Sequence, residues 1–217
     1  HRFVANKESY KADKVEPKFI NAWGIAIRPK GAGGHFWVTA HDISYEYVGD
    51  VQASSDPKLR TLHTDKLERV TLPIGTPENF ATGTVFSDST KDFVITQKVE
   101  GVEDITAPSK FLFSSDGGII SAWTERKKAD GTFDRADHAE NVIDQSKEGA
   151  QFFGLTLSND YSRLYVADFG AAPAVKVFDG KFKLTSIAFD QPFDENKNSK
   201  VDPGEYAPFN VQGLKTP

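Results

Sequence analysis

The sequence has no cysteine, no methionine and no long apolar run among its 217 residues. The absence of cysteine excludes disulfide bonds within the chain and thiolate metal sites. No apolar stretch approaches the roughly 18 residues that a membrane-spanning helix requires, so no membrane span is expected. The net charge of −5 is distributed along the chain, which gives neither a nucleic-acid footprint nor a polybasic membrane patch.

Sequence motifs of common enzyme classes are also missing. The chain has no Gly-x-Ser-x-Gly nucleophile motif, no Gly-Lys-Ser/Thr phosphate-binding motif and no His-Glu-x-x-His metal motif. No catalytic residue is therefore assigned from the sequence. Its 38% apolar and 26% charged residues are typical of a soluble globular protein, and its 217 residues are enough for one sizeable domain or two small ones.

A pair of short strands recurs along the chain. In each copy a glycine lies within an alternating apolar strand, a polar turn follows, and a β-branched or aromatic strand returns. The third copy continues through residues 174–178 and 181–187, which makes four consecutive antiparallel strands, the unit of a propeller blade. The copies are residues 23–27 with 36–40, 82–87 with 92–96, and 153–158 with 163–168.

Two partial copies accompany these repeats. Residues 111–114 and 119–123 flank an Asp116-Gly117 turn, which indicates a β-hairpin. Residues 207–213 resemble the start of another innermost strand. Residues 124–150, by contrast, are charged and lack a 3.6-residue apolar stripe, so we expect a long exposed connection between strands there.

These units predict an all-β fold, in which residues 1–217 form a single β-propeller domain of four-stranded antiparallel blades. A generic β-sandwich also gives short strands at regular spacing and is the alternative. The repeats account for only about three to four blades, and a propeller closes its blades into a ring to protect their edges. The domain is therefore expected to be incomplete, or to be completed by another chain.

Residues 194–205 have the spacing of an EF-hand-like calcium loop. Calcium takes about six to eight oxygen ligands, which a short loop supplies from alternate side chains and one backbone carbonyl. Position 6 is Ser199, where the sharp turn favours glycine, and Pro203-Gly204 prevents a helix from starting inside the loop. The predicted Ca²⁺ ligands are Asp194, Asn196, Asn198, the carbonyl of Lys200, Asp202 and Glu205.

We expect this ion to brace the loop on a β scaffold, because no helix pair of a calcium sensor flanks it. The alternative interpretation is an acidic, Asn-rich surface turn that holds no ion. A weak calcium site fills only where calcium is near millimolar, which favours a location outside the cell.

Four segments stand in a particular order along the chain: residues 21–26 (Asn-Ala-Trp-Gly-Ile-Ala), 81–86 (Ala-Thr-Gly-Thr-Val-Phe), 116–123 (Asp-Gly-Gly-Ile-Ile-Ser-Ala-Trp) and 206–212 (Tyr-Ala-Pro-Phe-Asn-Val-Gln). Together they resemble an uncharacterised family of exported bacterial β-propeller proteins, some of which carry a C-terminal surface-sorting segment. Residues 164–179 also resemble an NHL-type propeller blade. The resemblance covers most of residues 19–213.

The resemblance implies a propeller fold, for which we expect six blades in the full ring. It also implies an exported protein that is extracellular, periplasmic or at the cell surface. Because the sequence starts at His1 with no signal-like segment, we expect a processed product. It implies no activity. The sequence departs from the family because the loop at 194–205 is an insertion, and because family members continue well beyond this point. An open edge near residues 209–212 is expected to meet either the missing C-terminal part or a second polypeptide.

Propellers place functional groups where the innermost strands begin, around the central tunnel. The sequence predicts a secreted, calcium-stabilised binding or scaffold module for a protein, a glycan or a surface polymer. The alternative is a metal-dependent, lactonase-like hydrolase or lyase whose metal sits in the tunnel. The fold alone does not decide between them. The predicted tunnel-lining residues are Asn21, Asn79, Thr82, Lys110, Gln151 and Asn210.

Overall fold

The computed structural model describes residues 2–29, 35–49, 55, 57–60, 62–64, 66–190, 194–198 and 200–214. Within these residues the regular structure is β-strand, apart from short 3-10 helices at Glu8–Tyr10 (η1), Pro57–Arg60 (η3) and Ser146–Glu148 (η4), and it includes no α-helix. None of the described helices is long and apolar enough to cross a membrane. The predicted all-β class is confirmed.

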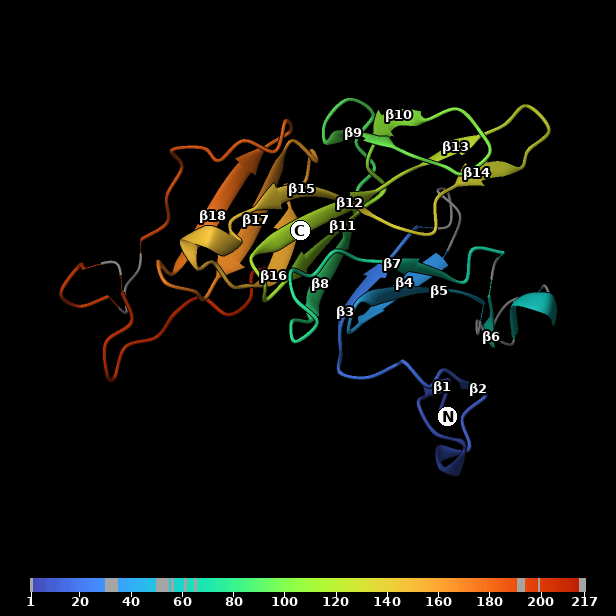
Figure 1. Cartoon of the computed structure of the whole chain (residues 1–217), viewed down its shortest axis with the longest axis horizontal. Coiled ribbons are helices and arrows are strands. Elements are labelled where there is room, and N and C mark those ends of the chain that lie inside the picture. Colours follow the sequence, from blue (N-terminus) through green and yellow to red (C-terminus); the bar gives the residue numbers. More distant parts are fainter. Residues whose placement is uncertain are drawn as a thin grey trace.

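Three antiparallel sheets lie side by side in the middle of the molecule (Figure 1). The first sheet contains β3 (Ala22–Ile27), β4 (His35–Ala40), β5 (Ile43–Gly49) and β6 (Leu62–His63) in that order, with β7 (Arg69–Thr71) also paired to β5. The second contains β8 (Ala81–Phe86), β11 (Phe111–Ser115), β12 (Ile119–Trp123) and β15 (Glu140–Asp144). The third contains β16 (Phe152–Leu157), β17 (Arg163–Asp168) and β18 (Ala174–Asp179).

Smaller pairs surround these sheets. They are the parallel pair β1 (Val4–Ala5) with β2 (Lys14–Val15), the hairpin β9 (Val94–Gln97) with β10 (Ile105–Pro108), and the hairpin β13 (Glu125–Lys127) with β14 (Phe133–Arg135). The pair β1 and β2 lies below the first sheet in Figure 1, and both hairpins lie above the sheets.

The first strand of each sheet lies at an edge of that sheet, and these three strands are neighbours in space. We call β3, β8 and β16 the inner strands; β3 contacts β8, and β8 contacts β16. The chain returns to the same place near its end, where residues 209–212 border a cavity together with all three inner strands. We call residues 209–213 the inner segment. The structure thus places the 207–213 fragment beside the predicted innermost strands.

Three of the four predicted hairpins form as expected, and one does not. The pairs β3 with β4 and β16 with β17 are antiparallel neighbours, as are β11 and β12 across the Asp116-Gly117 turn. In the second predicted copy, however, β8 pairs with β11 and β9 pairs with β10.

The turn after β8 explains this difference. Ser89 Oγ accepts hydrogen bonds from the backbone N–H groups of Lys91 and Asp92, and Phe93 has a φ of 57°. These features direct the chain away from β8 before β9 begins. In the third copy, β18 pairs with β17 as predicted, but residues 181–187 form only an isolated bridge between Leu184 and Phe178 instead of a fourth strand.

The expectation that residues 124–150 form a long exposed connection is correct only in part, because residues 127–133 and 146–149 are exposed but the segment also contains regular strands. This segment contains β13, β14 and β15, and β15 completes the second sheet beside β12. Thr124, Asp134 and Ile143 are buried. The strands are short and lie among charged residues, so neither helical nor alternating apolar periodicity marks them in the sequence.

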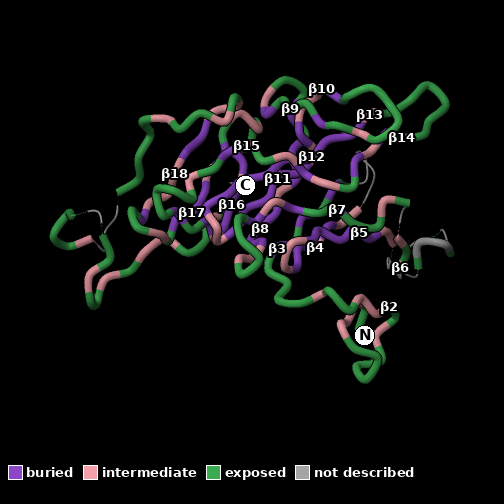
Figure 2. The backbone as a smooth tube through the Cα atoms, in the orientation of Figure 1, coloured by how far each residue is buried: buried purple, intermediate pink, exposed green. Residues whose placement is uncertain are grey.

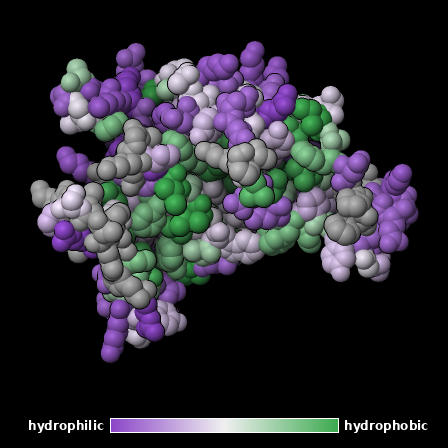
Figure 3. All heavy atoms as spheres, turned by 180° about the vertical axis from the view of Figure 1, so that it is seen from behind, coloured by the Kyte–Doolittle hydropathy of each residue, from purple (hydrophilic) through white to green (hydrophobic). Residues whose placement is uncertain are grey.

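Apolar cores join the sheets. Trp37 of the first sheet packs with Phe111 and Trp123 of the second, and all three rings are fully buried. Leu112 of the second sheet belongs to another core with Phe152 of the third. Figure 2 shows burial concentrated along the central strands, while the peripheral loops are exposed. Seen from behind, hydrophobic residues gather near the middle of the molecule, and hydrophilic residues dominate its ends (Figure 3).

Candidate functional site

Glycines set the spacing between the inner strands. A Cβ atom on Gly24 would lie 2.7 Å from the backbone N of Thr84, and one on Gly83 would lie 2.5 Å from the Cδ2 atom of Leu155. Both distances are shorter than real Cβ contacts. The neighbour of Gly24 is backbone, so only glycine allows such close packing there, whereas a larger residue at Gly83 would have to displace the Leu155 side chain. A Cβ atom on Gly154 would likewise come too close to Asn210 of the inner segment.

A cavity of about 380 Å³ lies where these segments converge. Each inner strand contributes a short stretch around its glycine, and the inner segment closes one side. The lining residues are Trp23, Gly24 and Ile25 of β3; Thr82, Gly83, Thr84 and Val85 of β8; Phe153, Gly154, Leu155 and Thr156 of β16; and Phe209, Asn210, Val211 and Gln212. The volume lies in the range of small-molecule sites.

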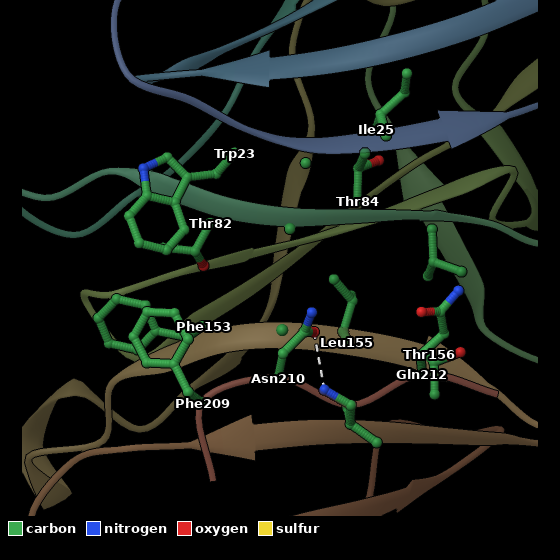
Figure 4. A pocket seen from close by; sticks show the side chains of 15 residues that line it. Trp23, Ile25, Thr82, Thr84, Phe153, Leu155, Thr156, Phe209, Asn210 and Gln212 are labelled. Atoms are coloured by element: carbon green, nitrogen blue, oxygen red, sulfur yellow. Dashed lines mark hydrogen bonds between the residues drawn. The ribbon is translucent and has the colours of Figure 1, made fainter.

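An aromatic cluster occupies one end of this cavity. The rings of Phe153 and Phe209 stack with centroids 4.6 Å apart, and the Trp23 ring lies 5.7 Å from each of them. Figure 4 shows these three side chains side by side, with Thr156 and Gln212 toward the other end. Trp23 is 43% exposed and Phe209 is 47% exposed, so the cluster offers apolar ring surface to a ligand.

Polar groups in the cavity are hydroxyls and amides, and its fifteen lining residues include no ionisable side chain. Thr82 Oγ1 donates a hydrogen bond to the carbonyl of Phe152, and Thr156 Oγ1 accepts one from the backbone N–H of Gly213. Asn210 Oδ1 accepts a hydrogen bond from the N–H of Val211. These lining side chains offer hydrogen-bonding groups but neither a general acid or base nor a carboxylate ligand for a metal.

The structure brings two of the six predicted tunnel residues, Thr82 and Asn210, into the cavity lining. Asn21 lies just outside it, where its Oδ1 accepts a hydrogen bond from Trp23 Nε1 at 2.7 Å. Asn21 also has a φ of 54°, a left-handed conformation that asparagine tolerates well. Its side chain therefore holds the indole of Trp23 at the strand entry.

The other three predicted residues do not belong to the lining. Asn79 Oδ1 accepts hydrogen bonds from the backbone and hydroxyl of Thr76 within a turn. Lys110 lies next to Asp88, with Nζ and Oδ1 3.9 Å apart. Gln151 is exposed, and its backbone N–H donates to Asp168 Oδ1.

Sequence reasoning missed the aromatic half of the site. Trp23 and Phe153 immediately precede Gly24 and Gly154, so an aromatic residue before the glycine was the available signal. Phe209 carries no such marker, because its segment is not a regular strand.

The predicted calcium loop has a connected set of side chains. The N–H of Asn198 donates to Asp194 Oδ1 and to Asn196 Oδ1, both at 3.0 Å. Asp202 Oδ2 accepts hydrogen bonds from the amides of Asn196 and Asn198. The loop is therefore folded on its own polar side chains.

Glu205 ties the two ends of the loop together. Its Oε1 accepts a hydrogen bond from the N–H of Glu195, and its Oε2 accepts one from the N–H of Asp202, both at 2.9 Å. Asn196, Asp202 and Glu205 line one cavity of about 480 Å³. Ser199, at position 6 of the loop, lies outside the described residues.

Hydrogen bonds from Asn196 and Asn198, with a smaller contribution from the charge of Lys200, hold the pKa of Asp202 below its ordinary value. A carboxylate that stays ionised is suited to a cation. Within the described ranges, however, no three His, Asp or Glu side chains are grouped as ligands for one ion. A calcium site here depends on the two asparagines as well as on the carboxylates.

The fold and the central cavity define an all-β protein with a neutral, partly aromatic site between its inner strands. Comparison with known proteins adds no assignment, because no protein-family model matches the chain and no curated protein matches it significantly.

Proposed function

We propose that this chain is a secreted, calcium-stabilised binding module whose sheets are blades of a β-propeller, and that its ligand binds in the central cavity. Three features support the propeller arrangement. The sheets stand side by side, their first strands are adjacent, and each inner strand packs its glycine against the next inner strand or segment. Blades of a propeller converge in this way on a common centre.

The main observation behind the proposed function is that the cavity is lined by uncharged side chains. A site with exposed aromatic rings, hydroxyls and amides, but no ionisable side chain, is suited to an uncharged ligand. A pyranose ring fits this description because its C–H face packs on aromatic rings while its hydroxyls hydrogen-bond to amides and hydroxyls. We therefore favour binding of a neutral glycan over catalysis in the tunnel.

Tryptophan fluorescence tests this proposal directly. Trp37 and Trp123 are fully buried, while Trp23 is 43% exposed, so acrylamide quenching of the native protein reports mainly on Trp23. Neutral cello-, malto- and xylo-oligosaccharides are the probes, and oligogalacturonate is the charged comparison. We expect at least one neutral probe to protect Trp23 from quenching, and Trp23→Ala and Phe209→Ala to abolish binding measured by calorimetry.

Phe133→Ala is the matched control, because Phe133 is a similarly exposed aromatic residue on β14 outside the cavity. It should leave binding unchanged. Binding that survives both cavity substitutions, or that requires the charged probe, would contradict the assignment of the ligand site.

We also propose that the loop at 194–205 holds one Ca²⁺ ion. Asp194, Asn196, Asn198, Asp202 and Glu205 would provide side-chain oxygens, and Lys200 a carbonyl. The hydrogen bonds among these residues support the proposal, because they hold all five side chains in one compact loop. Bound calcium would replace the amide contacts on Asp202 and neutralise the carboxylates.

Calcium is expected to raise the melting temperature. An ion that binds only the folded state at a hundredfold excess over its Kd stabilises the protein by about 2.7 kcal/mol, or roughly 5–10 °C for a chain of this size. Differential scanning calorimetry in millimolar Ca²⁺ and in excess EDTA measures the shift. Asp194→Ala and Glu205→Ala should both remove it.

Glu195→Ala is the control for this experiment, since Glu195 is an exposed acid in the same loop that is not a predicted ligand. It should keep the calcium shift. If both ligand variants also kept the calcium-dependent rise in melting temperature, the ion would bind elsewhere. If the native protein showed no rise, the loop would be an acidic surface turn that holds no ion.

A further inference from the structure

A second cavity, of about 330 Å³, is lined by residues of the N-terminal segment up to the entry of β3. We call it the N-terminal cavity. Val4 and Ala5 of β1 and Tyr10 of η1 form part of its wall, and Ile20 and Asn21 lead from it directly into β3. In Figure 1 this part of the chain lies below the first sheet.

Contacts with the first sheet hold the walls of the N-terminal cavity in place. Phe19, which lines this cavity, packs edge-on against Tyr45 of β5, with the ring centroids 5.4 Å apart. Val4 belongs to the same apolar cluster, in which Tyr45 is almost completely buried. The cavity is therefore anchored to the core of the first sheet, and a site that keeps its shape binds a ligand without the cost of ordering it.

The N-terminal cavity offers the same kinds of group as the central cavity, with one addition. Tyr10 is 49% exposed and Ile20 is 51% exposed, so they provide ring and aliphatic surface. Asn6 and Asn21 supply amides. The addition is Arg2, whose Nη1 donates a hydrogen bond to the carbonyl of Tyr10 at 2.8 Å. A guanidinium carries five N–H donors, so Arg2 can also donate to the oxygens of a ligand.

Trp23 and Asn21 connect the two cavities. Trp23 lines the central cavity, Asn21 lines the N-terminal cavity, and the hydrogen bond of 2.7 Å from Trp23 Nε1 to Asn21 Oδ1 joins them. In Figure 4 the indole nitrogen lies on the side of Trp23 that is away from Phe153 and Phe209. Residues 20–23 are all exposed, so the surface between the two cavities is open to solvent.

We propose that the N-terminal cavity is a second binding site for the same glycan, which is an oligosaccharide chain that runs from the aromatic cluster across Trp23 to Tyr10 and Arg2. Successive sugars present the same ring faces and hydroxyls, so they require aromatic or aliphatic surface and hydrogen-bonding groups at successive places. The two cavities supply both on either side of Trp23. This inference rests on the proposed function, because it requires a glycan in the central cavity.

The dependence of affinity on chain length measures the second site. Calorimetry with cello-, malto- and xylo-oligosaccharides, from disaccharides to hexasaccharides, gives the Kd of each, and quenching of Trp23 reports whether the disaccharide occupies the central cavity. In the series that binds, we expect the Kd of the native protein to fall at least about tenfold from disaccharide to hexasaccharide, because the second contact becomes intramolecular. An affinity that no longer rises beyond the disaccharide would overturn the proposal.

Tyr10→Ala and Arg2→Ala separate the two sites. Each should raise the Kd for the hexasaccharide about tenfold and leave the Kd for the disaccharide unchanged. Phe133→Ala is the matched control, because Phe133 is an exposed aromatic residue on β14 that lines neither cavity. It should bind every oligosaccharide as the native protein does, and circular dichroism confirms that each variant is folded.

Equal weakening of disaccharide and hexasaccharide binding by Tyr10→Ala and Arg2→Ala would also overturn the proposal, since the two residues would then act through Trp23 and not on the ligand. The same titrations separate failure of this inference from failure of the proposed function. A protein that binds both oligosaccharides equally well, with Trp23 protected from quenching, keeps its central site and loses only the second one. A protein that binds no oligosaccharide loses both.

Discussion

Replacing Glu125 with alanine is expected to lower the free energy of unfolding by about 3–5 kcal/mol, the usual cost of breaking a buried ion pair from one side. Glu125 Oε1 lies 2.6 Å from a terminal nitrogen of Arg28, and Glu125 Oε2 accepts a hydrogen bond from Arg135 Nε at 2.7 Å. Arg28 follows the last residue of β3, whereas Glu125 begins β13. The pair therefore connects the first sheet to a hairpin beyond the second.

The free energy of unfolding falls because the Arg28 guanidinium stays buried after the Glu125 carboxylate that pairs with it has been removed. Glu103→Ala is the matched control: Glu103 is 3.9 Å from Arg126, and its side chain is 90% exposed. An exposed pair contributes at most about 1 kcal/mol, so this variant should be close to the native protein. Urea unfolding followed by circular dichroism compares the two. An equal decrease in the free energy of unfolding of both variants would contradict the buried location of Glu125.

Trp37→Ala is expected to lower the free energy of unfolding by a similar amount, about 3–5 kcal/mol, because it removes a large ring from a packed core. The Trp37 ring stacks on Phe111 at 4.3 Å and lies 5.0 Å from the Trp123 ring. Its indole N–H has no hydrogen-bond partner among the residues that the structure describes, so the expected loss of stability is one of packing alone. The same urea experiment measures it.

Trp23→Ala provides the comparison, since it removes the same side chain from a half-exposed position. We expect it to abolish ligand binding with a much smaller loss of stability. Trp37→Ala, in contrast, should loosen the junction between the first and second sheets. A loss below about 1 kcal/mol for Trp37→Ala would mean that the two sheets do not share a core.

Local sequence patterns predicted the strands whose partners are close in the chain. The hairpin of β16 and β17 has an alternating strand, a polar turn and a returning β-branched strand, and all of its pairing lies within residues 152–168. The same holds for β11 and β12 across their Asp-Gly turn. In such hairpins the turn residues set the register, so the sequence is sufficient.

Pairing between distant strands could not be predicted in this way. β8 prefers β11 to the nearer β9, and β15 joins β12 from a charged segment with no clear periodicity. The choice depends on burying Phe111 and Trp123 against Trp37 of another sheet. Strand patterns report which faces are apolar but not which sheet will cover them.

The two candidate sites also differ in whether the sequence alone could predict them. The spacing of oxygen-bearing residues in 194–205 is local, and the sequence alone determined which side chains the loop could hold together through short-range hydrogen bonds. The central cavity is different, since Trp23, Phe153 and Phe209 meet only after the three sheets have packed together through their inner-strand glycines. The sequence determined the elements, and tertiary packing decided which of their side chains share a site.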